Sequence, residues 1–242
     1  MRKYINGEIY RLLRKKSMYI YFCALAVGYM LITYIRSGGF NATAITSEAN
    51  TWFFLLPPLA GGFLFAAVYT DDLNAKNLIT LVGFGMSKTK IVIAKLILMV
   101  IGGVIVFGVV PLLHCGLFVV CGWMPASTDI AVVYALSCKN LLISVAFAAL
   151  SGIVVYGLQR ATFAIVTYLL LAFNVVSSLL SAGLKMFGDF LSEYLMPGIS
   201  NRILFGMISG DFPFQPLIEY AVYVIIAVVI SVLAFRKKEM EF

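Results

Sequence analysis

The stretch 96-LILMVIGGVIVFGVVPLLHCGLFVV-120 contains no charged side chain and is long enough to cross a lipid bilayer as one helix. A hydrocarbon core about 30 Å thick is spanned by roughly 20 apolar residues. Unpaired backbone amides are costly in hydrocarbon, so a stretch of this kind is expected to be helical. The segment therefore predicts a transmembrane helix.

Five further stretches in the chain are similarly apolar. The 242 residues are 62% hydrophobic and only 12% charged, with a mean hydropathy of +1.00, whereas soluble domains are about 45–50% apolar and about 25% charged. We expect an all-α polytopic membrane protein, with about six transmembrane helices in a single transmembrane domain over 1–242. The alternation that marks membrane β-strands is absent. The approximate limits of the six stretches are 17–35, 51–70, 96–120, 139–158, 161–181 and 217–235.

The distribution of basic residues predicts the orientation of these helices. Lys and Arg near short loops are retained on the cytoplasmic side. With both termini inside, 14 of the 18 basic residues and five of the 11 acidic residues are cytoplasmic, a net charge of +9 against −2 outside. The overall charge of +7 then reflects topology and contact with anionic lipids, and no nucleic-acid partner is expected.

Residues 1–16 have the pattern of an amphipathic helix that lies in the membrane interface and leads into the first span at an elbow. A basic tail without structure is the alternative. Stretch 17–35 is expected to be a retained span rather than a signal peptide, since no small-x-small cleavage site precedes Ser37. The apolar face of the predicted elbow helix carries Ile5, Ile9, Leu12 and Leu13.

The outer segment 182–216 is far longer than a simple turn requires. Apolar residues recur on one helical face before Pro197-Gly198, and residues 203–208 are compatible with a second short turn. We therefore expect an outer helix-break-helix between spans five and six. The apolar positions are Leu184, Phe187, Phe190, Leu191, Tyr194 and Leu195.

Small and helix-breaking residues predict bends and close helix packing. Pro57-Pro58 and Gly61-Gly62 lie in the second span, and Gly102-Gly103 lies in the third. Ser144, Ala148 and Gly152 recur every four residues in the fourth, a stripe that admits another helix closely. That helix belongs either to this chain or to a second subunit.

Residues that would support catalysis or metal binding are few. His114 is the only histidine and is expected to be packed or hydrogen-bonded, and Lys139 and Glu219 lie near the outer ends of their spans. The four cysteines lack metal-ligand spacing, although Cys121 and Cys138 flank a short loop, and whether they pair is left open. We expect no metal, no cofactor and no catalysis by this chain itself.

Residues 83–89, GFGMSKT, end in Lys-Thr as a phosphate-binding loop does. That motif needs a glycine directly before the lysine and a second glycine five positions earlier. Ser87 and Val82 occupy those places. The chain is therefore not expected to bind ATP by this route.

The longer stretch 71-DDLNAKNLITLVGFGMSKTKIVIAK-95 follows the second span. It resembles the cytoplasmic coupling loop of bacterial ATP-binding-cassette (ABC) exporter permeases of the type-two family, which includes the bacitracin and lantibiotic immunity permeases. Gly85-Met86-Ser87-Lys88 corresponds to their Gly-Ile-Ser-Arg, and Ala94-Lys95 to a later Ala-Lys, whereas Asn77-Leu78 replaces their common Gly-Thr. The similarity extends to the basic elbow, the six spans, the long outer segment and the Phe-Arg-Lys-Lys at 235–238.

The resemblance implies a permease subunit in a bacterial plasma membrane. Its elbow and its coupling loop 71–95 would dock on separate ABC-type ATPase subunits that hold ATP and Mg, and two permease copies, identical or related, would pair around the substrate. Export of a peptide antibiotic, or protection from one, would be the function. Positive-inside topology alone is the alternative explanation of the loop residues. The implied ATPase-contact residues are Asp71, Asp72, Lys76, Gly85, Ser87, Lys88 and Lys90.

Polar residues in the fifth span predict a translocation pathway, because polar side chains in lipid turn toward a bundle interior or a wet cavity. Helix packing explains them nearly as well. A self-contained channel or carrier, and a membrane-embedded enzyme, are competing functions, but the spans lack the internal repeats and clustered ionisable groups that these would lead us to expect. The predicted pathway residues are Thr167, Asn174, Ser177, Ser178 and Ser181.

Overall fold

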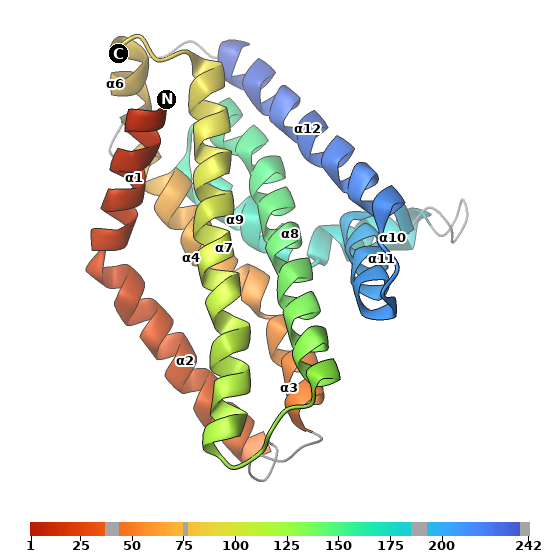
Figure 1. Cartoon of the computed structure of the whole chain (residues 1–242). Coiled ribbons are helices and arrows are strands. Elements are labelled where there is room, and N and C mark those ends of the chain that lie inside the picture. The colour runs from red at the N-terminus through yellow and green to blue at the C-terminus, as the bar shows by residue number, and fades with distance from the viewer. Residues whose placement is uncertain (37–43, 75–76, 185–192, 238–242) are drawn as a thin grey trace.

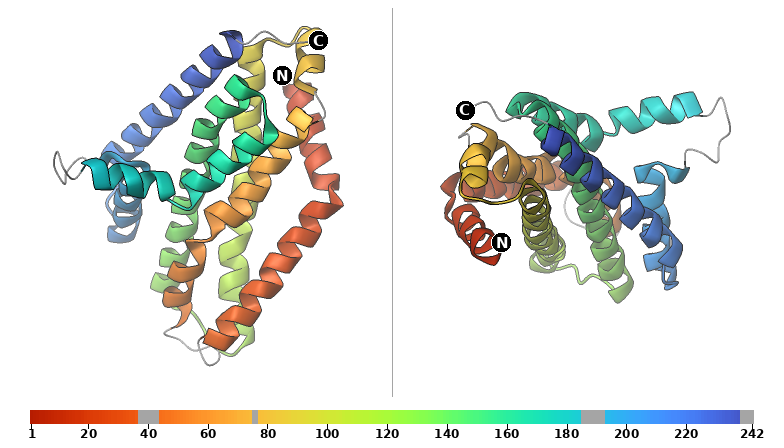
Figure 2. Two further views of the ribbon diagram at one scale, coloured as in Figure 1. Left: turned by 180° about the vertical axis from the view of Figure 1, so that it is seen from behind. Right: turned by 90° about the horizontal axis from the view of Figure 1, so that it is seen from above.

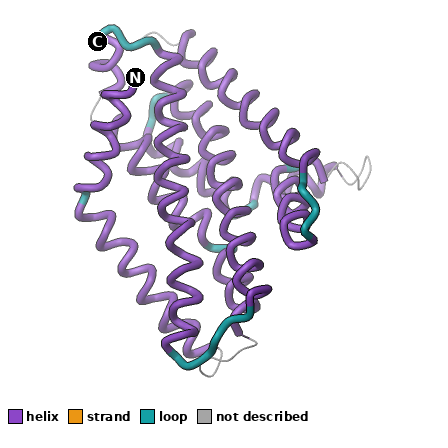
Figure 3. Tube along the Cα trace, in the orientation of Figure 1, coloured by secondary structure: helices purple, strands orange, loops and turns teal. Residues whose placement is uncertain are grey.

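The structure, a computed structural model, describes residues 1–36, 44–74, 77–184 and 193–237, and every regular element in them is helical (Figure 3). The prediction of an all-α chain is confirmed for these residues. The elements are α1 (Arg2–Arg14), α2 (Lys16–Arg36), α3 (Ala44–Phe53), the π-helix η1 (Pro57–Gly61), α4 (Gly62–Phe65), the π-helix η2 (Ala66–Thr70), α5 (Asp71–Asn74), α6 (Asn77–Gly83), α7 (Lys88–Val120), α8 (Ser127–Leu158), α9 (Ala161–Ala172), α10 (Val175–Leu184), α11 (Met196–Ser209) and α12 (Phe214–Lys237).

Four of the described helices are long and apolar enough to cross a membrane: α2, α7, α8 and α12. Two further spans result if each of two bent helix pairs counts as one, with bends of 42° between Ile45–Phe53 and Pro57–Leu73 and of 58° between α9 and α10. Four to six spans are therefore present by length and composition. The number expected from the sequence is the upper end of this range.

Helix α8 is the centre of the bundle. It packs against α3, α7, α9, α11 and α12 (Figure 1). In its most apolar stretch 61% of the residues are buried, against 6% in α2 and 11% in α12. The core is therefore built around α8, whereas α2 and α12 leave most of their apolar surface uncovered.

The small-residue stripe on α8 serves packing within the chain. Ser144, Ala148 and Gly152 are all buried. A Cβ atom added at Gly152 would lie 3.2 Å from the hydroxyl oxygen of Ser231 on α12, and one added at Gly61 would lie 2.8 Å from that of Ser144. Of the two interpretations left open by the sequence, helix contact inside this chain accounts for the stripe.

The second span is widened as well as bent. The segment from Pro57 to Thr70 contains two π-helical turns, which leave backbone carbonyls turned away from regular helix partners. Tyr168 on α9 donates its hydroxyl to the carbonyl oxygen of Pro57 at 3.1 Å, and Tyr21 on α2 donates to that of Leu59 at 3.1 Å. Tyrosines from two neighbouring helices thus satisfy this irregular backbone.

Helix α7 lies close to its neighbours at the predicted glycine pair. A Cβ atom at Gly102 would lie 2.7 Å from Leu64 Cδ1, and one at Gly103 would lie 2.5 Å from Leu141 Cδ1. Leu64 belongs to α4 and Leu141 to α8, so α7 packs between these two helices. The expected close packing at Gly102-Gly103 is observed.

The fifth span is not the continuous helix that the sequence predicts. Helix α9 ends at Ala172, and the chain turns by 58° before α10 begins at Val175. Asn174 adopts a left-handed conformation at the turn, with φ +57°, which asparagine tolerates better than most residues. The stripe from Thr167 to Ser181 therefore lies on two helices of different direction.

The outer segment also differs from its prediction. Pro197 lies in the first turn of α11, where its missing N–H is not needed, and the helix continues to Ser209. Pro197-Gly198 therefore begins a helix instead of separating two, and residues 203–208 are part of it. Residues 185–192 of the predicted preceding helix lie outside the described residues.

The cytoplasmic ends predicted from charge lie together at one end of the bundle, where Figure 1 shows the beginning of α1, α6, the beginning of α7 and the end of α12. The side chain of Arg236 on α12 donates a hydrogen bond of 3.1 Å to the hydroxyl of Thr89 on α7. At the opposite end α7 turns into α8 at Cys121-Gly122, with Gly122 at φ +89°. All four cysteines are free, so Cys121 and Cys138 do not pair in this structure.

The positive-inside rule predicts that the exposed Cys121 lies outside the cell and Lys90 inside, because the basic residues gather at the end that carries Lys90. In a variant with Cys121 as its only cysteine, a membrane-impermeant maleimide should label intact cells. In a cysteine-free chain carrying Lys90→Cys, labelling should require lysis. The reverse pattern would mean that the orientation is inverted.

Candidate functional site

A buried ionic cluster joins three elements at the basic end of the bundle. Asp72 on α5 and Lys95 on α7 are each 1% exposed, and their side chains form an ion pair. Arg11 on α1 donates from Nη1 to the other carboxylate oxygen of Asp72 at 2.8 Å. The Asp72 carboxylate therefore binds a cation from each of the two helices that flank it.

Glu8 and Tyr4 on α1 complete the cluster. The Glu8 carboxylate accepts from Lys95 Nζ at 3.1 Å and from Arg11 Nη2 at 2.7 Å. The ring centroid of Tyr4 lies 5.6 Å from Lys95 Nζ, within the range of a cation–π contact. Burial lowers the pKa of Arg11, but the carboxylates of Asp72 and Glu8 outweigh this effect and raise that pKa above its ordinary value.

A second ion pair lies at the rim of the cluster. Lys15, between α1 and α2, approaches the carboxylate of Asp71 to 2.5 Å, and both side chains are about one third exposed. Exposed pairs of this kind contribute little to stability, whereas removing one member of a buried pair is costly. The cluster around Asp72 is therefore the stronger link between α1 and the loop.

The predicted coupling loop 71–95 contains the short helix α6 at Asn77–Gly83, and α7 begins within it at Lys88. Gly85 turns the chain with φ +80°, and Ser87 caps α7 by accepting from the backbone N–H of Lys90 at 3.4 Å. Gly85 and Ser87 therefore shape the turn that begins α7.

The other predicted ATPase-contact residues have different surroundings. Asp71 and Asp72 bind cations of their own chain, and Lys76 lies outside the described residues. Lys88 places Nζ 5.3 Å from the ring centroid of Phe235 on α12. Lys90 is exposed.

Phe84, which the sequence analysis did not select, is the most prominent side chain of this loop. It is 86% exposed at the turn between α6 and α7. An exposed aromatic side chain at a turn between helices is available to pack against another protein or against the membrane interface. Its position next to Gly83 and Gly85 was the available signal, because two glycines around one aromatic residue indicate a turn that displays it.

The predicted pathway residues are distributed over α9, α10 and the turn between them. The hydroxyl of Thr167 donates a hydrogen bond to the carbonyl of Phe163, and that of Ser181 donates to the carbonyl of Ser178, each within its own helix. Ser178 is exposed and Ser177 half-buried. Asn174, at the bend between the two helices, lines a polar cavity.

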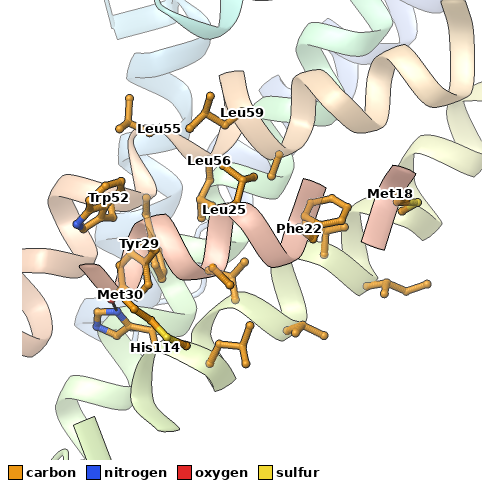
Figure 4. A pocket seen from close by; sticks show the side chains of 18 of the residues that line it. Met18, Phe22, Leu25, Tyr29, Met30, Trp52, Leu55, Leu56, Leu59 and His114 are labelled. Carbon is orange, nitrogen blue, oxygen red and sulfur yellow. Dashed lines mark hydrogen bonds between the residues drawn. The ribbon is translucent and has the colours of Figure 1, made fainter. Parts of the chain in front are cut away.

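A cavity of about 290 Å³ lies between α2 on one side and α3, η1 and α7 on the other (Figure 4). Its wall is almost entirely apolar, and Phe22 and Leu25 of α2 and Leu59 of η1 are among the residues that line it. Helix α2 runs along the side of the bundle (Figure 2). Such a groove accommodates a hydrocarbon or another apolar chain. Leu13, Met18 and Tyr19 also line it.

His114 and Tyr29 supply polar atoms to this groove. His114 is 1% exposed and donates from Nε2 to the carbonyl oxygen of Ile45 at 2.8 Å, so that Nδ1 is left to accept from the hydroxyl of Tyr29. Phe53 and Phe118 pack against the imidazole ring. The expectation of a packed, hydrogen-bonded histidine is confirmed.

No protein-family model matches this chain, and searches of curated proteins and of solved structures give no match. Among the described residues, no group of three or more His, Cys, Asp or Glu side chains is placed to hold a metal ion.

Replacing Asp72 by Leu should lower the free energy of unfolding by about 3–5 kcal/mol, because Lys95 is then left buried with only Glu8 as an anion. Adding Lys95→Met should recover part of the loss, since an apolar pair needs no counter-charge. Asp71→Leu is the matched control and should cost less than about 1 kcal/mol. The free energy of unfolding of the unmodified chain and of the three variants can be measured in detergent. Equal losses for Asp71→Leu and Asp72→Leu would contradict the claim that the buried ion pair stabilises the chain more than the exposed one.

Proposed function

We propose that this chain is the membrane-spanning permease subunit of an ATP-driven ABC exporter in a bacterial plasma membrane. ATP and Mg are then bound by separate ATPase subunits, and a second permease copy completes the pathway. The observation that carries the proposal is the buried cluster of Asp72, Lys95 and Arg11, which links α1 and α7 to the loop bearing Phe84. The resemblance of residues 71–95 to a coupling loop assigns the same segment this role.

The ionic cluster would transmit a movement of the loop to the neighbouring helices. A displacement of α5 and α6 by a docked ATPase moves the carboxylate of Asp72, and the two cations follow it because separating buried opposite charges is costly. Lys95 lies in α7 and Arg11 in α1, which continues into α2 after the break at Lys15. Movement at the loop is therefore passed to α2 and α7, the two helices that border the apolar groove.

The uncovered surfaces of the bundle agree with this proposal. Helices α2 and α12 are apolar but mostly unburied, as expected of helices that face lipid or a second permease. The apolar groove beside α2 would take the apolar part of a substrate. An amphipathic peptide antibiotic has such a part, and this is the substrate class that we propose.

A self-contained channel or carrier is the second candidate function, and nucleotide hydrolysis separates the two. The purified chain alone should hydrolyse no ATP, whereas the chain isolated with its membrane partners should carry a Mg-dependent ATPase activity. Phe84→Asp should reduce that co-isolated activity at least about tenfold, because a buried aromatic anchor contributes about 2 kcal/mol or more to binding.

Phe212→Asp is the control, since Phe212 is 76% exposed at the opposite, outer face between α11 and α12. It should leave the co-isolated ATPase activity unchanged. Lys88 is a less suitable target because its charge also contacts Phe235. Equal activity in the Phe84 and Phe212 variants, or hydrolysis by the isolated chain, would refute the coupling role of this loop.

A further inference from the structure

A second cavity, of about 220 Å³, lies where the bend between α9 and α10 meets α3, α8 and α11. Its wall differs from that of the apolar groove because it is rich in amides and carries a cation. No acidic residue is among those that line it. The polar residues of the wall are Asn50, Lys139, Asn140, Asn174, Ser200 and Asn201.

Lys139 is the charged group of this cavity. It lies twelve positions after the start of α8, or about 18 Å along the helix axis. Within the described part of the chain, its ammonium group forms no hydrogen bond or ion pair. A lysine in a transmembrane segment normally faces a partner or a wet cavity, and here the cavity lacks a counter-charge.

Asn174 is a second residue of this cavity with a polar atom that lacks a partner. Its Oδ1 atom is buried, and in the part of the chain that is described no hydrogen bond reaches it. The left-handed backbone at this residue holds the carboxamide at the wall of the cavity. A buried polar atom without a partner is costly, so a ligand that offers a hydroxyl to Asn174 and a negative charge to Lys139 would satisfy both.

We infer that this cavity binds an anionic phosphate ester that carries a free hydroxyl, such as a glycerophosphate group. The phosphate oxygens accept from Lys139 and from the surrounding amides, and the hydroxyl donates to Asn174. Lipid head groups and soluble phosphate esters offer the same charged acceptor oxygens to such a site. The inference does not depend on the exporter proposal, because it concerns only binding by this chain.

The test uses the purified chain in neutral detergent and follows its melting temperature. Phosphatidylglycerol should raise the melting temperature, whereas phosphatidylcholine with the same acyl chains should not. Free glycerol 3-phosphate forms the second arm. A rise with the lipid alone identifies a membrane lipid as the source, and a rise with the free ester identifies a soluble one; both support the phosphate site.

Two variants remove the proposed contacts without disturbing the fold. Lys139→Met deletes a charge that has no partner, so the melting temperature without ligand should not fall, while the apparent affinity for the ligand should drop at least about tenfold. Asn174→Gly retains the left-handed backbone and should weaken binding as well. Lys139→Arg should preserve the response, as should Lys16→Met, which removes an exposed lysine at the beginning of α2.

Three results would overturn the inference. The first is an undiminished response to the phosphate ligands in Lys139→Met. The second is the absence of any selective stabilisation by either phosphatidylglycerol or glycerol 3-phosphate. The third is stronger stabilisation by the carboxylate N-acetylglycine than by glycerol 3-phosphate, which would assign the cavity to a different anion.

Discussion

The arrangement of the basic end of the bundle depends on one buried carboxylate. Asp72 is buried, and its carboxylate forms ion pairs with Lys95 and Arg11. Both cations also pair with Glu8. An uncompensated charge in this position would be strongly unfavourable. The four side chains therefore fix where α1, α5 and α7 lie relative to one another, although contacts between apolar side chains could be made in several registers.

The ionic cluster and the two cavities divide the molecule into regions with different chemistry. At the basic end, charges hold α1 and the loop 71–95 together. Beside α2 lies an almost entirely apolar groove. At the bend between α9 and α10, Asn174 and polar residues from α3, α8 and α11 meet. The long central helix α8 supports this polar region and packs against α7, which borders the groove.

Much of the fold follows from the apolar stretches, and the errors have a common physical cause. The limits of the spans were placed at charged residues, yet α7 begins before Lys95 and α8 begins before Lys139. Lys95 is neutralised by Asp72, and Lys139 faces a cavity, so neither lysine ends its helix. These circumstances depend on residues distant in sequence; Arg11 and Asp72, for example, are 61 positions apart.

The bend at Asn174 and the ion pairs that Asp72 forms within its own chain were not predicted, for related reasons. An asparagine inside an apolar stretch was interpreted as a pathway residue, but its tolerance of the left-handed conformation was the more informative property. Glu8, an acid on a helix otherwise rich in basic residues, was the available sign that α1 contributes to an ionic cluster. Pairing it with Lys95 required the fold itself.

The distance between α1 and α7 tests the central role of Asp72 most directly. Spin labels at Lys3 and Lys90, two surface positions on these helices, can be measured by pulsed electron paramagnetic resonance in lipid nanodiscs. A narrow distance distribution is expected in the otherwise unmodified chain, and a broad one after Asp72→Leu, because α1 is released when its buried anion is lost. An equally narrow distribution in the Asp72→Leu variant would show that apolar packing alone positions α1, and would contradict the account.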